Sequence, residues 1–185
     1  GQGKLTITGQ LGEVMQESAQ AALSWVRAHA DDLGLAEDWF AKHDVHIHVP
    51  AGAVPKDGPS AGVTMATAIA SLVRDTPVAD DIGMTGEITL TGQVLPIGGL
   101  REKSLAAQRA GLKRIVIPRD NEPDLDELPA ETRESLQFIP ADTIEDVFAA
   151  AFDGRSARSR GRAPRSVERQ AARASLATPP PGARA

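Results

Sequence analysis

The apolar and polar positions of the chain repeat with two different periods, which together predict a domain built from both strands and helices. Patterns typical of strands mark residues 4–8, 44–49, 113–118 and 136–139. The three- and four-residue steps typical of helices mark residues 12–33, 60–73, 98–110 and 143–152. A hairpin that turns at Thr91-Gly92 is predicted over residues 82–95. The fold class expected from this order is α/β (α+β), a mixed sheet packed by helices.

Single residues at the segment ends sharpen this prediction. Gly111 follows the helix at 98–110 in the usual position of a C-terminal cap, and Thr143 is expected to cap the start of the last helix. A loop is predicted at residues 51–59, which contain two glycines and two prolines. The helix after it, residues 60–73, contains no charged residue and is therefore expected to be buried nearly all round.

Composition narrows the class of protein. Hydrophobic residues make up 41% and charged residues 24% of the 185 residues, which is typical of one globular domain. The chain has no cysteine, so a disulfide framework, a thiolate metal site and a cysteine nucleophile are excluded. No segment approaches the length of an apolar membrane span or a signal peptide. We therefore expect a soluble, cytoplasmic protein without membrane contact.

Charge divides the chain into a domain and a tail. Residues 153–185 carry eight arginines against Asp153 and Glu168, so the net charge of −5 combines a tail of +6 with a body of −11. We predict a domain over residues 1–152 and a disordered Arg/Ala/Pro-rich basic tail over residues 153–185. Such a tail can contact DNA or an acidic partner. The acidic body and the lack of a groove-reading motif do not indicate DNA binding by the domain itself.

Ser60 is a candidate nucleophile because it follows the predicted loop and starts the helix at 60–73. Backbone N–H groups at a helix start can stabilise the oxyanion of acyl transfer, and the small Ala61 and Gly62 would let a substrate carbonyl approach. Serine is also a preferred helix cap, so Ser60 by position alone can have a purely structural role.

Lys103 is the first candidate for the base that a serine nucleophile requires. Its neighbours on the predicted helical face are all apolar: Gly99, Leu100, Ala106, Ala107 and Ala110. Such surroundings favour the neutral amine, which can accept a proton, unless the side chain extends to water.

His46 and His48 are the rival candidates, since they share one side of a strand and precede the serine loop. With Asp57 they could complete a Ser-His-Asp triad, or they could support the loop structurally. We expect no metal site, because no third ligand accompanies the two histidines.

Four segments occur in order along the chain: Gly12-Glu13-Val14-Met15-Gln16-Glu17-Ser18, Pro55-Lys56-Asp57-Gly58-Pro59-Ser60-Ala61-Gly62, Met84-Thr85-Gly86-Glu87-Ile88-Thr89-Leu90 and Gly92-Gln93-Val94-Leu95-Pro96-Ile97-Gly98-Gly99-Leu100-Arg101-Glu102-Lys103. Together they resemble the C-terminal proteolytic domain of the Lon protease family, in its soluble bacterial or organellar form, from about residue 3 to residue 152. The resemblance implies the fold of that domain, which is similar to the second domain of a small-subunit ribosomal protein.

The resemblance implies a Ser–Lys dyad, with Ser60 as the nucleophile and Lys103 as the general base. It further implies that the hydroxyl of Thr85 helps to position the lysine amine, and that Asp57 is the loop acid beside the nucleophile. His46 and His48 correspond to the surroundings of the site and not to its base. The implied activity is that of an ATP-dependent serine endopeptidase, which hydrolyses unfolded or regulatory proteins through an acyl-enzyme ester.

The resemblance also implies parts beyond this chain. No Gly-x-x-x-x-Gly-Lys-Ser/Thr segment is present, so ATP and Mg belong to an upstream AAA+ ATPase domain, and this chain needs no cofactor of its own. We expect a fragment that lacks N-terminal strands of the family, polypeptide substrates, and a homo-hexamer in the full-length protein. The alternative is a catalytically silent Lon-like module kept for oligomerisation or interaction.

Overall fold

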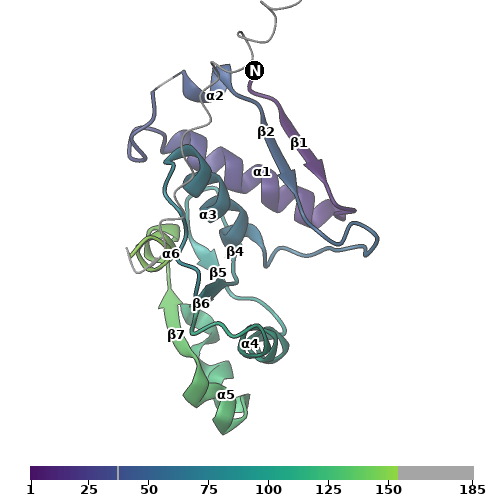
Figure 1. Ribbon diagram of the computed structural model, residues 1–185, viewed down its shortest axis with the longest axis vertical. Helices are drawn as coiled ribbons and strands as arrows, with labels where there is room; N and C mark the ends of the chain where they lie inside the picture. Colours follow the sequence, from purple (N-terminus) through teal and green to yellow (C-terminus); the bar gives the residue numbers. More distant parts are fainter. Residues whose placement is uncertain (37, 154–185) are drawn as a thin grey trace, which may run out of the picture.

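Three small sheets form the framework of the computed structural model, which describes residues 1–36 and 38–153 (Figure 1). The first is a parallel pair, β1 (Leu5–Thr8) and β2 (Val45–His48). The second is parallel in the order β3-β6-β7, with β3 (Ile82–Met84), β6 (Arg114–Pro118) and β7 (Gln137–Ala141). The third is an antiparallel hairpin of β4 (Glu87–Ile88) and β5 (Val94–Leu95). The mixed α/β class is confirmed, but the parallel and antiparallel strands lie in separate sheets and not in one mixed sheet.

Helices pack against these sheets. Four of them were predicted: α1 (Glu13–Ala28), α3 (Gly62–Val73), α4 (Leu100–Arg109) and α6 (Ile144–Ala151). Three short elements were not: α2 (Trp39–Lys42), the 3₁₀ helix η1 (Arg119–Glu127) and α5 (Ala130–Ser135). No helix among the described residues is long and apolar enough to cross a membrane. Apart from Asp153, the predicted basic tail lies outside the described residues.

Helix α1 is shorter than its apolar pattern suggested. It ends at Ala28, and the ring of the next residue, His29, stacks on Trp25 at 4.0 Å between centroids. The His29 Nδ1 also lies 2.9 Å from the Trp25 carbonyl oxygen. This ring covers the last turn of the helix, and the chain leaves the helical conformation there despite the apolar Leu33 farther on.

The predicted hairpin over residues 82–95 is correct only in its second half. Its first strand, β3, pairs with β6 instead. Between β3 and β4, the Thr85 N–H donates to the Val116 carbonyl and the Gly86 N–H donates to the Ser60 carbonyl, both at 3.0 Å. These bonds draw the backbone away from a continuous hairpin and against the serine segment.

Helix α3 packs against α1 at the centre of the larger core cluster, yet it is not buried all round as expected. Thr64, Ala68 and Leu72, spaced four residues apart, are exposed, and Leu72 keeps 68% of its accessible surface. A second cluster lies under α4, where Leu100 and Ala107 meet Ile115, Ile117 and Leu136. Strand β6 is buried along its whole length, which is typical of a central parallel strand.

Candidate functional site

A cavity of about 390 Å³ lies where α3 and α4 meet the β3-β6-β7 sheet, and Ser60 and Lys103 both line it. The remaining lining residues are mostly small or apolar: Ala61, Thr64, Gly83, Met84, Thr85, Ala106, Ala107, Ala110, Leu112 and Ile115. The structure therefore brings together a hydroxyl and an amine that are 43 positions apart in the sequence, in surroundings that contain little else that is polar.

Ser60 stands in the turn before α3 and does not cap this helix. The N-cap is Ala61, and the helix begins at Gly62. The backbone carbonyl of Ser60 accepts hydrogen bonds from the Gly86 N–H at 3.0 Å and from the Thr85 hydroxyl at 3.2 Å. Thr85 is buried, and its hydroxyl fixes the backbone of the serine segment through this bond. The contact that the resemblance implied between Thr85 and Lys103 stays a prediction.

Close packing against β4 fixes the start of α3. A Cβ atom on Gly62 would lie 2.8 Å from Cγ2 and 2.9 Å from the backbone nitrogen of Ile88. Real Cβ atoms essentially never come so close, so only glycine allows the helix to start this near to the strand. The position of Ser60 thus depends on a close approach of two backbones.

Lys103 is half-buried on the first turns of α4, and its side chain turns back towards the loop before the helix. Its Nζ donates to the Gly98 carbonyl oxygen at 2.9 Å. Gly99 between them has a left-handed backbone (φ +71°), and a Cβ there would lie 3.5 Å from the Lys103 Nζ. Among the described residues, the Lys103 amine has no hydrogen bond to the Ser60 hydroxyl.

Asp57 fixes the loop before Ser60 to the start of α1. Its Oδ1 accepts hydrogen bonds from the Met15 N–H at 2.9 Å and the Gly58 N–H at 2.8 Å. Met15 is in the first turn of α1, so the carboxylate acts as a helix cap supplied by a distant segment. It packs so closely on Gly12 that any Cβ at that position would overlap it.

Lys56 supports the same loop from within. Its Nζ donates to the carbonyl oxygens of Ala51 at 2.8 Å, Val54 at 2.9 Å and Gly9 at 3.3 Å. An ammonium group carries three donors, so this one is fully used. Lys56 is therefore a structural residue, and the loop before Ser60 is tied to the end of β1.

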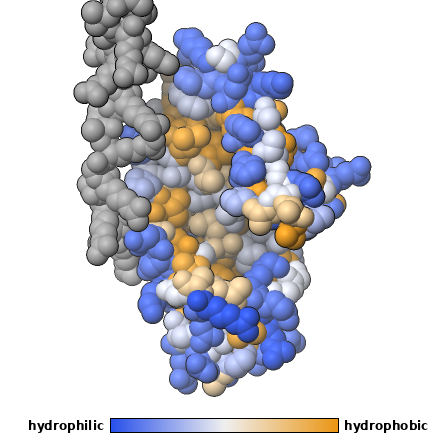
Figure 2. Space-filling model, turned by 45° about the vertical axis from the view of Figure 1, so that its right-hand side comes forward, coloured by the Kyte–Doolittle hydropathy of each residue, from blue (hydrophilic) through white to orange (hydrophobic). Residues whose placement is uncertain are grey.

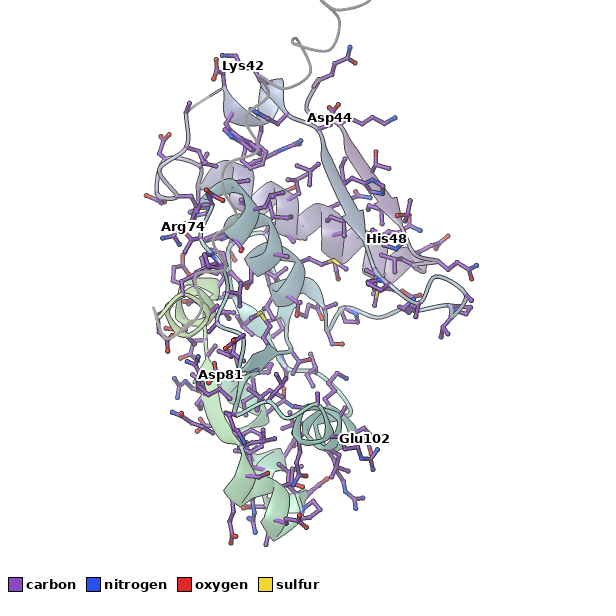
Figure 3. The ribbon with its side chains drawn as sticks, in the orientation of Figure 1. Lys42, Asp44, His48, Arg74, Asp81 and Glu102 are labelled. Carbon is purple, nitrogen blue, oxygen red and sulfur yellow. The ribbon has the colours of Figure 1, made fainter. Side chains whose placement is uncertain are left out.

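His46 and His48 are exposed and face the same side of β2, as the strand pattern predicted. Both rings lie on the Thr8 hydroxyl of β1: His46 Nε2 at 2.9 Å and His48 Nδ1 at 2.8 Å. Figure 3 labels His48 at the end of this strand and Asp44 directly before its start. The described residues give neither histidine a hydrogen bond to Ser60, and contain no group of three or more metal-ligating His, Asp or Glu side chains. Neither histidine lines the Ser60–Lys103 cavity itself.

An apolar groove leads along the exposed side of α3. It has a volume of about 510 Å³ between α3 and β2, and it shares Ala61 and Thr64 with the Ser60–Lys103 cavity. Figure 2 shows apolar surface along the middle of one face of the molecule, between hydrophilic rims. The exposed Leu72 and the two histidines are among the residues that line the groove.

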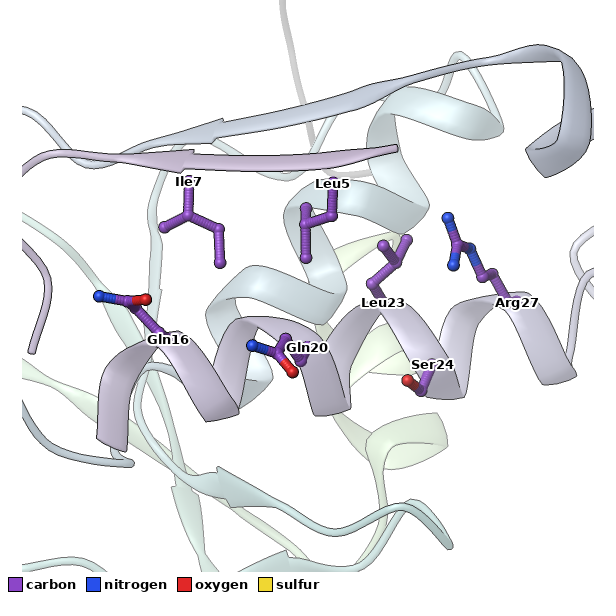
Figure 4. Close-up of a pocket in the computed structure, with 7 residues that line it drawn as sticks. All are labelled: Leu5, Ile7, Gln16, Gln20, Leu23, Ser24 and Arg27. Carbon is purple, nitrogen blue, oxygen red and sulfur yellow. The ribbon is translucent and has the colours of Figure 1, made fainter. Parts of the chain in front are cut away.

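A cavity of about 520 Å³ lies between β1 and α1, and its lining differs from that of the Ser60–Lys103 cavity (Figure 4). Leu5 and Ile7 point into it from the strand, and the remaining lining residues come from α1: Gln16, Gln20, Leu23, Ser24 and Arg27. Arg27 is the one titratable side chain of this lining, and it donates to the Gly3 carbonyl at 2.6 Å. Arginine stays protonated in proteins, so the lining of this cavity contains no general base for Ser24.

A buried ion cluster holds the β3-β6-β7 sheet to the end of α6. The Arg114 guanidinium is almost fully buried and binds both carboxylate oxygens of Asp81, with the Nε bond at 3.0 Å. It also pairs with Asp153 just beyond α6. The hydrogen bonds to Asp81 raise the pKa of Arg114 further above its ordinary value. The cluster is outside the Ser60–Lys103 cavity and has a structural role.

Comparison with known proteins decides the family. A model of the family described as "Lon protease (S16) C-terminal proteolytic domain" matches residues 1–154. The chain belongs to this family. It is 59% identical over 158 residues to Lon protease 1 of Sorangium cellulosum, a match that covers 85% of the chain and 20% of the relative. It is 56% identical over 153 residues to Lon protease 2 of Bdellovibrio bacteriovorus, and this match covers 83% of the chain and 19% of the relative. It is also 56% identical over 154 residues to Lon protease 1 of Bacillus subtilis, and this match covers 83% of the chain and 20% of the relative.

This Lon domain spans about a fifth of the length of the curated relatives that it matches. Other parts of such enzymes therefore lie beyond the region that the chain covers. Within the domain, sequence reasoning identified Ser60 and Lys103, which the structure places on one cavity. It missed Thr8 and the Gly98 carbonyl, because a bridging hydroxyl and a backbone acceptor have no recognisable sequence signal.

Proposed function

We propose that this Lon domain is a serine endopeptidase in which Ser60 is the nucleophile and Lys103 is the general base. The observation that carries the proposal is that both side chains line one largely apolar cavity. A lysine amine in its neutral form can act as a general base, and this is the role that we assign to Lys103. Arginine in place of Lys103 could not accept the proton, since it does not deprotonate in proteins.

The reaction follows from this pair. The neutral Lys103 amine takes the Ser60 proton while Oγ attacks the peptide carbonyl carbon, and the resulting ammonium returns a proton to the departing amine. An acyl-enzyme ester remains. Lys103 then takes a proton from water, whose oxygen attacks the ester carbon, and the regained proton returns to Ser60 as the acid product leaves.

The developing oxyanion needs N–H donors near Ser60. The Gly62 and Val63 N–H groups are already used, by the carbonyls of Pro59 at 3.0 Å and Gly86 at 3.2 Å. The Ser60 and Ala61 N–H groups have no hydrogen bond within the part of the chain that the structure describes. We therefore assign oxyanion stabilisation to these two backbone amides.

The domain would act within a longer, ATP-dependent protease. ATP and Mg would bind an AAA+ ATPase part outside this chain, and unfolded or regulatory polypeptides would be the substrates. A homo-hexamer, a cytoplasmic location and a fold similar to the second domain of a small-subunit ribosomal protein are further predictions from the family resemblance.

The alternative is a catalytically silent Lon-like module for oligomerisation or interaction. One observation favours it: the Lys103 amine is bound to the Gly98 carbonyl and not to the Ser60 hydroxyl. A neutral amine can keep this N–H bond to the carbonyl and accept the serine proton on its lone pair, so the bond is also compatible with the role of a base.

A peptidase assay on an unstructured polypeptide tests the proposal. We expect Ser60→Ala and Lys103→Ala to abolish turnover, and Lys42→Ala to leave it unchanged. Lys42 is a matched control, because it is an exposed lysine whose ion pair among the described residues is with Asp38, the N-cap of its own helix. Turnover that survives Lys103→Ala would refute the dyad.

A further inference from the structure

Asn121 is a buried polar residue that the catalytic proposal does not use. It lies in η1 and is 4% exposed. Its side-chain amide pairs with the backbone of Ile97 in both directions: Oδ1 accepts from the Ile97 N–H at 2.9 Å, and Nδ2 donates to the Ile97 carbonyl at 3.0 Å. The Nδ2 also donates to Asp124 at 2.6 Å. The Asn121 side chain thus satisfies both backbone groups of Ile97, as a neighbouring strand would. Ile97 belongs to the loop between β5 and α4.

This loop carries the acceptor of the Lys103 amine. Gly98, which follows Ile97 directly, provides the carbonyl that binds the Lys103 Nζ at 2.9 Å. Gly98 is exposed, and no atom lies within 4 Å of the position of a Cβ there. Gly99 has no side chain either and has a left-handed backbone. The two glycines contribute no side-chain packing, so on the N-terminal side of Gly98 the loop is held through Ile97, which packs against the second core cluster.

We propose that Asn121 is a positioning residue for Lys103, acting through Ile97 and the Gly98 carbonyl. This inference rests on the proposed function, in which Lys103 must be held near Ser60. A backbone-like pair of bonds requires both a donor and an acceptor on one short side chain. Asparagine meets this requirement, and aspartate does not, because its carboxylate would face both the Ile97 carbonyl and Asp124.

Thr132 provides a matched control in the same part of the molecule. It is 1% exposed, and its hydroxyl donates to Gln108 Oε1 at 2.9 Å, which joins α5 to α4. Thr132→Val and Asn121→Ala each remove a buried hydrogen-bonding group next to α4. Only the second acts on the loop that carries Gly98.

The first measurement is the rate at which a fluorophosphonate probe phosphonylates Ser60, with loss of fluoride, in the full 185-residue chain. Misplacement of a catalytic group by about 1 Å can cost 10²-fold, so we expect Asn121→Ala to slow the reaction on the order of 10- to 100-fold, and Thr132→Val to leave it near the wild-type rate. Asn121→Asp should be at least as slow as Asn121→Ala. Equal rates for Asn121→Ala and Thr132→Val, at equal stability, would overturn the proposal.

Two further readouts need no turnover. Mass spectrometry after competitive amine labelling should show changed reactivity of Lys103 in Asn121→Ala and not in Thr132→Val. Hydrogen exchange at the Ile97 amide should accelerate on the order of 10-fold in Asn121→Ala alone, because its acceptor is lost. If Asn121→Ala does not fold, Asn121→Leu fills a similar volume and still removes both bonds to Ile97. A folded Asn121→Leu protein with wild-type reactivity of Ser60 and Lys103 contradicts the proposal.

Lys103→Ala in the probe assay separates the two claims. If it reacts at the wild-type rate, the proposed function fails irrespective of Asn121. If it loses reactivity and Asn121→Ala behaves like Thr132→Val, only the positioning role of Asn121 fails.

Discussion

Replacing Gly12 with alanine perturbs the contact that holds the loop before Ser60 onto α1. Gly12 has an ordinary extended backbone (φ −67°, ψ 172°), so alanine can adopt it without strain. The new methyl group would, however, overlap the Asp57 carboxylate. We therefore expect the carboxylate to move away and to lose its hydrogen bond from the Met15 N–H.

The magnitude follows from three contributions. Loss of a side-chain acceptor at a helix start costs about 1 kcal/mol, within a range of about 0.5–2 kcal/mol. A Gly-to-Ala change restricts the unfolded chain and stabilises by about 0.4–1 kcal/mol. Alanine is a poorer N-cap than glycine, which offsets that gain. The net loss of unfolding free energy for Gly12→Ala is therefore about 1 kcal/mol.

Urea unfolding followed by tryptophan fluorescence measures this loss, and a double-mutant cycle with Asp57→Ala tests its cause. We expect each single variant to lose about 1 kcal/mol and the double variant to lose no more than either, because Gly12→Ala acts by displacing Asp57. Gly52→Ala is the control, since no atom lies within 4 Å of its Cβ position. Additive losses in the double variant, or equal stability of Gly12→Ala and Gly52→Ala, would refute the reasoning.

Three further substitutions test other contacts by urea unfolding. Arg114→Met should cost about 3–5 kcal/mol of unfolding free energy, because it removes the buried guanidinium that binds both Asp81 and Asp153; a loss below about 1 kcal/mol would contradict this role. Ser104→Ala should be neutral or stabilising, because the buried Ser104 hydroxyl has no hydrogen-bond partner among the described residues; a clear loss would reveal an unrecognised partner. Asp44→Asn tests a pH effect: backbone N–H donors from Gln2 and then Lys4 lower the pKa of the Asp44 carboxyl. The stability that this carboxylate contributes is therefore present above its unfolded pKa of about 3.9 and is lost as the pH falls below it. The difference between wild type and Asp44→Asn should shrink between about pH 6 and about pH 3, and a constant difference would contradict the assignment.

Local patterns were enough to predict the order of most elements and the two main candidate residues. The apolar face around Lys103 and the loop-to-helix position of Ser60 are both consequences of helical periodicity, which depends only on neighbours in sequence. The short elements α2, η1 and α5 escaped prediction because segments of this length carry too little periodicity.

Positions that depend on contacts between distant segments could not be predicted. Ser60 was expected at the start of the helix over residues 60–73, but its carbonyl bonds to Thr85 and Gly86 hold it in the turn before α3. The pairing of β3 with β6, in place of a long hairpin, has the same origin. Asn121 gave no signal at all, because an asparagine in a polar segment looks the same whether it faces water or a backbone.

The sequence by itself determined the family, the alternation of strands and helices, and the choice of Ser60 and Lys103 as the residues to examine, because these depend on local periods and on ordered motifs. Only the tertiary structure decided that both residues line one cavity, that Asp57 caps α1, and that the Lys103 amine rests on a carbonyl whose loop is held by Asn121. These facts are distances between segments that the chain brings together only when the core forms, and no local pattern encodes them.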